Sequence, residues 1–212
     1  AATGWALGSA FVLTIGALAV MGVVYNVRPL RSKERPVVDV LSEAINNPIR
    51  LIAGWFIVLD TAPIPPLSLC VSYWFVGCYF MALKRFAEYR FFGQEGSDPA
   101  AYRASFAWYD EPRLLTTIMF YAAASMLFFG AFLMRYQLEL VLSFPLIAAT
   151  MAVYLRLGFQ PESVLQTPEK LYRETTLVIV ASLTTIAIVV LLMVELPGVE
   201  QAFEVPTKIR PD

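Results

Sequence analysis

Six apolar stretches separated by charged segments most constrain how this chain can fold. Each approaches or exceeds the roughly 17–25 residues that a helix needs to cross the hydrocarbon of a bilayer. With 58% hydrophobic and 16% charged residues, the chain is more apolar than a soluble domain, which has about 45–50% and 25%. We predict an all-α, polytopic membrane helical bundle with six transmembrane helices within residues 1–196, and a polar tail at 197–212. The predicted spans are 5–25, 37–59, 67–83, 114–134, 138–157 and 175–194.

Helix-breaking residues refine these boundaries. Residues 84–92 are expected to extend the third helix, which Gly93, Gly96 and Pro99 then end. A short helix at 99–109, capped by Ser97 or Asp98, should follow, because proline suits the first position of a helix. Similar signals predict a kink at Phe144-Pro145, a helix start after Thr167 and an extended arm from Pro197.

The distribution of cations predicts the orientation. Because cytoplasmic loops carry an excess of Lys and Arg, the odd-numbered loops should be cytoplasmic and both termini should lie on the outer side. We therefore expect a multi-pass integral membrane protein of the bacterial inner-membrane type. The net charge of −1 suggests no nucleic-acid partner. The odd loops hold Arg28, Arg31, Lys33, Arg35; Lys84, Arg85, Arg90, Arg103, Arg113; and Arg156, Lys170, Arg173.

The second apolar stretch carries a polar stripe. Asp39, Glu43, Asn46, Asn47 and Arg50 recur at steps of three and four, which places them on one helical face. A charge at membrane depth costs about 2.5–3.5 kcal/mol, so this face should line a cavity. Interhelical hydrogen bonding is the alternative. Arg50 should face inward and meet an anion, either Glu43 or a lipid phosphate.

Absent and scarce residues narrow the chemistry. The chain has no histidine, which removes a histidine general base and most zinc sites. Cys70 and Cys78 lie about 12 Å apart on one helix, too far for a disulfide. At the cytoplasmic helix ends, candidates to clamp a phosphate are Tyr25, Arg28, Arg31 and Lys84-Arg85, although ordinary loop topology also explains the cations.

Several ordered stretches resemble the UbiA superfamily of intramembrane prenyltransferases. The third of them is most similar to the branch that moves phosphoribose onto polyprenyl phosphate. The stretches are YNVRPLRSK at 25–33 with DVL at 39–41; NNPIRLIAGW at 46–55; LKRFAE at 83–88 with R-x-S-x-x-x-Y from Arg103 to Tyr109; and SFP at 143–145 with QTPEKLYR at 166–173. The six predicted spans match the last six of the family's nine helices in order and orientation.

This resemblance implies a ligand and a cofactor. The ligand would be a polyprenyl phosphate or diphosphate, or a quinone-like isoprenoid, in a protein surrounded by membrane lipids and possible partner subunits. The cofactor would be Mg²⁺, which prefers oxygen ligands. Candidate metal ligands are Asp39, Glu43 and Glu88. Candidate substrate-binding residues are Tyr25, Arg28, Asn46, Asn47, Arg50, Lys84 and Arg85.

The chain departs from the family at both metal motifs. The first, of the type NDxxDxxxD, is absent and would precede Ala1, and the second reads Lys84-Arg85-Phe86-Ala87-Glu88 where two aspartates are usual. We therefore expect a prenyltransferase-like protein that is incomplete or inactive as a transferase by itself. The alternative is a non-catalytic structural or lipid- or quinone-binding subunit of a larger membrane complex. A transporter is disfavoured because no internal repeat is visible.

Overall fold

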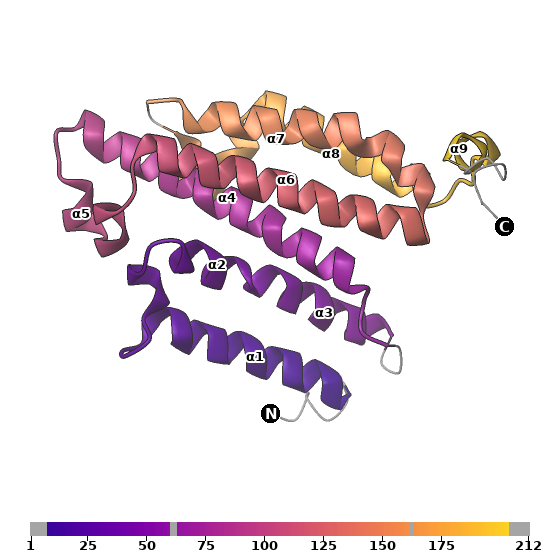
Figure 1. Cartoon of the computed structure of the whole chain (residues 1–212), viewed down its shortest axis with the longest axis horizontal. Helices are drawn as coiled ribbons and strands as arrows, with labels where there is room; N and C mark the ends of the chain where they lie inside the picture. The colour runs from indigo at the N-terminus through magenta and orange to yellow at the C-terminus, as the bar shows by residue number, and fades with distance from the viewer. Residues whose placement is uncertain (1–7, 60–62, 162, 204–212) are drawn as a thin grey trace, which may run out of the picture.

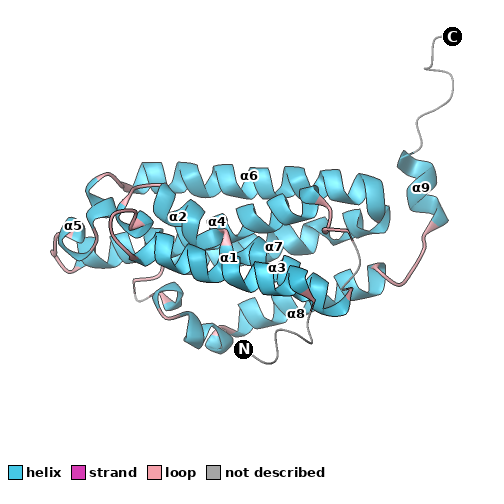
Figure 2. Cartoon of the chain, turned by 90° about the horizontal axis from the view of Figure 1, so that it is seen from below, coloured by secondary structure: helices cyan, strands magenta, loops and turns pink. Residues whose placement is uncertain are grey.

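The computed structural model describes residues 8–59, 63–161 and 163–203, and this part of the chain is helical throughout, without strands (Figure 2). The α-helices are α1 Ser9–Asn26, α2 Val38–Ala44, α3 Asn46–Val58, α4 Leu67–Gln94, α5 Pro99–Tyr102, α6 Glu111–Tyr136, α7 Phe144–Gly158, α8 Thr175–Leu191 and α9 Pro197–Phe203. Short 3₁₀ helices are η2 Ser32–Glu34, η3 Ala104–Ala107, η4 Leu138–Ser143, η5 Val164–Gln166 and η6 Pro168–Arg173. The predicted all-α class is confirmed for the described residues.

The long helices lie side by side in a row, and the chain reverses its direction from one long helix to the next (Figure 1). Helix α1 packs on α2 and α3, these pack on α4, α4 packs on α6 and α7, and α7 packs on α8. Successive connections alternate between the two ends of the row. Helix α5 marks one end and α9 marks the other (Figure 1). Helix α4 therefore occupies the centre, and α1 and α8 form the two edges.

Among the described residues, four helical segments are long and apolar enough to cross a membrane: Ser9–Asn26, Leu67–Gln94, Glu111–Tyr136 and Leu138–Gly158. Helix α8 is apolar but has only 17 residues, and the second predicted span is interrupted. The structure thus supports a membrane helical bundle with these four candidate spans, and the six-span count stays a prediction.

The second predicted span is two helices, α2 and α3, where we expected one. They are separated at Ile45. Pro48 follows three residues later and has no N–H to donate to the carbonyl of Ala44, so one bond of the helical ladder is lost at this point. Asn46 lies in the same turn, and its side-chain amide donates to the carbonyl of Glu43 at 3.1 Å.

Other boundaries are partly as expected. The extension of the third helix is confirmed, since α4 ends at Gln94. Asp98 caps α5 by accepting a hydrogen bond from the Ala100 N–H. The helix expected at 99–109 is shorter, because Arg103 has an extended backbone and ends it.

Corrections also apply nearer the C-terminus. The segment before Phe144 is a 3₁₀ helix, so the kink at Pro145 is a junction between η4 and α7. Thr167 precedes η6, but its side chain makes no capping hydrogen bond. The arm from Pro197, expected to be extended, begins as the short helix α9, and residues 204–212 of that tail lie outside the described residues.

The core of the bundle surrounds α4. Cys78, Leu83 and Phe86 on α4 are inaccessible to solvent, and they belong to the same cluster as Leu114 and Ile118 of α6. On the opposite side α4 meets the second predicted span at Gly77. A Cβ placed on Gly77 would lie within 3.3 Å of the Cβ of Ala44 and would overlap the side-chain amide of Asn47. Gly77 therefore sets how closely α4 approaches these residues.

We expect Gly77→Ala to destabilise the bundle by about 1–3 kcal/mol, because the added methyl group overpacks this contact. Adding Asn47→Ala should restore part of the loss. The readout is the unfolding midpoint of purified protein in detergent. Gly54→Ala on α3 is the matched control, since nothing lies within 4 Å of its Cβ position. Equal effects of both glycine substitutions would contradict this account.

Candidate functional site: a buried ion network beside a basic cleft

Arg85 is the centre of a buried ion network at the end of the row where α5 lies. Its side chain, on α4, is 2% exposed. Its Nη1 donates to Glu88 at 2.9 Å and its Nε to Asp39 at 3.3 Å. Its Nη2 donates to Glu43 at 2.8 Å and to the Tyr25 hydroxyl at 3.3 Å. The planar guanidinium has five N–H donors, which allows one side chain to join three carboxylates.

Asp39 is the most buried carboxylate of the network, with no exposed surface. Besides Arg85, it accepts hydrogen bonds from Ser105 at 3.3 Å and from the Tyr109 hydroxyl at 2.8 Å. The Tyr109 oxygen in turn accepts from the backbone N–H of Val37 at 2.7 Å. Burial, followed by the negative charge of Asp39, raises the pKa of Tyr109 well above its usual value. Tyr109 therefore remains a neutral donor to Asp39 at physiological pH.

The network joins four parts of the chain. Tyr25 comes from α1, Asp39 and Glu43 come from α2, and Arg85 with Glu88 comes from α4. The segment after α5 supplies Ser105, Tyr109 and the Arg103 guanidinium, whose Nη1 lies 3.6 Å from Asp39. Three carboxylates thus face two guanidinium groups. Because an uncompensated buried charge is costly, loss of any one partner should destabilise the protein by leaving the other charges unpaired.

Mg²⁺ does not fit the three carboxylates in this arrangement. Asp39, Glu43 and Glu88 are the metal ligands expected from the sequence, and they do converge. However, each of them lies within 2.8–3.3 Å of a nitrogen of Arg85, so a guanidinium occupies the point at which a cation would sit. No cluster of metal-ligating side chains occurs in the described ranges.

A basic cleft lies beside the network. Its volume is about 270 Å³. Two of its guanidinium nitrogens, Nε of Arg31 and Nη1 of Arg103, are buried without a hydrogen-bond acceptor. Arg31 Nε is 3.1 Å from Glu34, but this ion pair lacks the alignment of a hydrogen bond. The cleft therefore has unfilled donor capacity. Its lining residues are Arg31, Lys33, Glu34, Tyr102, Arg103 and Ala104.

An apolar groove opens between α2, α4 and α6. Its volume is about 480 Å³, and the Trp74 indole in its wall donates to the carbonyl of Leu41 at 3.0 Å. Val37 lines the groove, and its backbone N–H bonds the Tyr109 hydroxyl. Tyr109 in turn bonds Asp39, and Asp39 forms an ion pair with Arg103, which lines the basic cleft. The network thus stands between the cleft and the groove. The groove is lined by Val37, Leu41, Trp74, Phe75, Thr116, Thr117, Phe120 and Tyr121.

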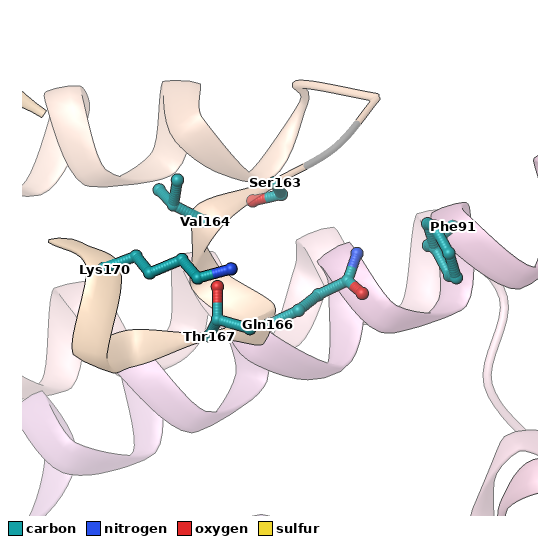
Figure 3. Close-up of a pocket in the computed structure, with 6 residues that line it drawn as sticks. All are labelled: Phe91, Ser163, Val164, Gln166, Thr167 and Lys170. Atoms are coloured by element: carbon teal, nitrogen blue, oxygen red, sulfur yellow. The ribbon is translucent and has the colours of Figure 1, made fainter. Parts of the chain in front are cut away.

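A second polar cleft, of about 320 Å³, is formed by η5, η6 and the end of α4. Figure 3 shows the Lys170 ammonium near the Thr167 hydroxyl, and the Gln166 side chain reaching along the cleft towards Phe91. Ser163 is already engaged, because its hydroxyl donates to Leu157 at 2.7 Å and accepts from the Leu165 N–H. With one cation and no orphaned buried donor in its lining, this cleft is the weaker anion site.

The structure brings together only some of the residues expected in the site. Tyr25, Asp39, Glu43, Arg85 and Glu88 meet in the network. The remaining candidates lie elsewhere: Arg28 is exposed in the turn after α1, Asn46 bonds the end of α2, Asn47 packs on Gly77, Lys84 is half-buried outside the network, and Arg50 is exposed on α3.

The expectation for Arg50 is wrong in two respects. Arg50 does not face inward, and Glu43 pairs with Arg85 instead. Asp39 and Arg50 lie 11 residues apart, about 20° from one another on an ideal helix, yet Asp39 is fully buried and Arg50 is exposed. Their surroundings differ because the helix is interrupted at Ile45, which lies between them, and because Arg85 contacts Asp39 but not Arg50.

Three residues of the network, Arg103, Ser105 and Tyr109, were not among the candidate site residues expected from the sequence. Their R-x-S-x-x-x-Y pattern contributed to the family resemblance but did not reveal that these side chains fold back onto Asp39. Arg31, a candidate to clamp a phosphate, and Lys33, explained by topology, both line the basic cleft. Among the aromatic residues of α4, Trp74 lines the groove, whereas Tyr79 is buried and its hydroxyl donates to the carbonyl of Met151.

Comparison with protein-family models, with curated proteins and with solved structures finds no match for this chain. The resemblance to the UbiA superfamily therefore remains an inference from the ordered sequence patterns.

We expect Arg85→Met to destabilise the protein by about 3–5 kcal/mol, because three carboxylates would lose their buried cation. Unfolding in detergent, followed by circular dichroism, measures the change. Arg173→Met removes the same charge from an exposed position at the same end of the bundle, so it should change stability by less than about 0.5 kcal/mol. An Arg85→Met protein as stable as this control would show that the network contributes little.

Proposed function

We propose that this chain is a membrane protein that binds the phosphate head of a long-chain isoprenoid lipid, such as a polyprenyl phosphate. The observation that carries the proposal is the basic cleft, in which two buried guanidinium nitrogens have a carboxylate nearby but make no hydrogen bond, together with an apolar groove on the other side of the Arg85 network. Arginine recognises phosphate oxygens through paired N–H donors. The isoprenoid identity of the tail rests on the resemblance to the UbiA superfamily.

The cleft, the groove and Arg85 have different roles in this proposal. Arg31, Lys33 and Arg103 supply three positive charges against the carboxylate of Glu34 in the cleft and that of Asp39 beside Arg103, which leaves an excess of one positive charge to attract an anionic group. The groove offers aromatic and aliphatic walls for the first part of an apolar chain. Arg85 is withheld from the ligand by its three carboxylates. Its role in the proposal is to hold Asp39, and through it Arg103 and Tyr109, in place between the two parts.

The proposal is limited to binding. A transfer reaction in the resembling family relies on Mg²⁺, and the carboxylates of this chain are committed to Arg85 instead. The same commitment favours the second candidate function, a non-catalytic lipid-binding subunit of a larger membrane assembly. The six-helix UbiA-like arrangement and the cytoplasmic position of the cleft belong to the proposal too, supported by the alternating connections (Figure 1) and the cation distribution.

Binding is tested with a polyprenyl monophosphate and the corresponding polyprenol in nanodiscs of neutral lipid. We expect the phosphate to bind more tightly than the alcohol, and Arg31→Gln with Lys33→Gln to weaken only phosphate binding, by about tenfold or more for two lost charge-assisted contacts. Lys170→Gln in the second polar cleft is the matched control and should bind as the wild type does. Equal affinity for phosphate and alcohol would refute the proposal.

Metal dependence separates the two candidate functions. We expect neither Mg²⁺ nor a chelator to change the unfolding midpoint of the wild-type protein, because Arg85 already neutralises the carboxylates. A metal that binds the folded state would stabilise it by about 2.7 kcal/mol at a concentration of 100 Kd. A stabilisation of that size by Mg²⁺, reversed by the chelator, would favour the transferase interpretation over the binding subunit.

A further inference from the structure

Arg50 is an unpaired cation in the middle of a predicted membrane span. It lies on α3, is exposed, and makes no ion pair or hydrogen bond with any described residue. Within the predicted spans, the other charged side chains lie near the span ends or belong to the Arg85 network. A lone charge at this depth costs about 2.5–3.5 kcal/mol, so an anion that neutralises Arg50 on the outer face of α3 would stabilise the protein in the membrane.

Arg50 is poorly placed to reach a lipid head group. Eight residues separate it from Val58, the end of α3, which corresponds to about 12 Å of helix. That is longer than an arginine side chain. Helical side chains also tilt towards the N-terminus of their helix, and so Arg50 points away from Val58. In the other direction, α3 begins four residues back at Asn46, and the 12 residues back to Val38, the start of α2 in the same predicted span, correspond to about 18 Å.

The surface around Arg50 permits close approach of another helix. Gly54 lies one turn further along α3, is exposed, and has nothing within 4 Å of its Cβ position. Ile57, a further turn on, is 55% exposed. Small residues allow membrane helices to approach closely, which strengthens polar contacts between them. Arg50, Gly54 and Ile57 therefore form one face, which we call the Arg50 face.

We infer that the Arg50 face binds a transmembrane helix of a partner protein that presents an Asp or Glu carboxylate at mid-membrane depth. Charge complementarity carries the inference, since a carboxylate neutralises the guanidinium and accepts its paired donors. A second copy of this chain does not supply that group. The carboxylates of the described spans lie towards the helix ends, and Asp39, Glu43 and Glu88 already bind Arg85. The inference is independent of the lipid site.

The test uses a synthetic transmembrane peptide of leucine and alanine with one central Glu, and matched peptides with Gln or Lys at that position. Energy transfer between labelled peptide and purified protein in phosphatidylcholine vesicles measures binding. Polar contacts between membrane helices contribute about 1–2 kcal/mol in model peptides, so the Glu peptide should bind about fivefold to thirtyfold more tightly than the Gln peptide. Gly54→Leu should weaken this binding while the charge remains.

Charge reversal makes the result specific. Arg50→Glu should transfer the preference to the Lys peptide, and Arg50→Gln, which serves if the reversed variant does not insert, should abolish it. Arg135→Glu near the end of α6 is the matched control and should leave the preference for Glu intact. The inference is overturned if the wild type does not distinguish Glu from Gln, or if Arg50 proves to govern retention of phosphatidylglycerol without any peptide preference.

Discussion

The engagement of one buried guanidinium by three carboxylates organises the end of the bundle where α5 lies. Arg85 is held by residues of α2 and of α4 itself, and by Tyr25 from α1. The carboxylate of Asp39 then fixes the segment after α5 through Ser105 and Tyr109. This dependence explains how a short irregular segment, with little regular hydrogen bonding of its own, is held in one place. It also explains the position of the basic cleft, because Arg103 reaches both Asp39 and the cleft.

The helical class was predictable because apolar length is a strong signal in membrane proteins. The span around α4 and its extension to Gln94 follow from hydrophobicity, and Asp98 follows from capping chemistry. The interruption at Ile45 was missed although Pro48 was visible, because membrane helices often tolerate proline and sequence alone does not show when the ladder opens. The α9 helix was missed because the sequence before Phe203 combines proline, glycine and polar residues, which are as common in extended arms.

The site was predictable in its residue types but not in its pairing. The periodic stripe identified Asp39 and Glu43 as buried polar groups, and both belong to the network. The same periodicity wrongly grouped Arg50 with them, because helical spacing gives a face but not what packs against that face. Which cation a carboxylate meets depends on contacts over long sequence separations. The link between Asp39 and Tyr109 spans 70 residues, and no local pattern encodes it.

The long sequence separations within the network bear on how such a chain enters the bilayer. Tyr25 and Arg85 are 60 residues apart, so the network closes only after α1, α2, α4 and the segment up to Tyr109 have all been synthesised. Until then, each of its charges must be tolerated alone. During synthesis these charges therefore depend on water or other polar groups for solvation, and assembly of the bundle then replaces that solvation with ion pairs.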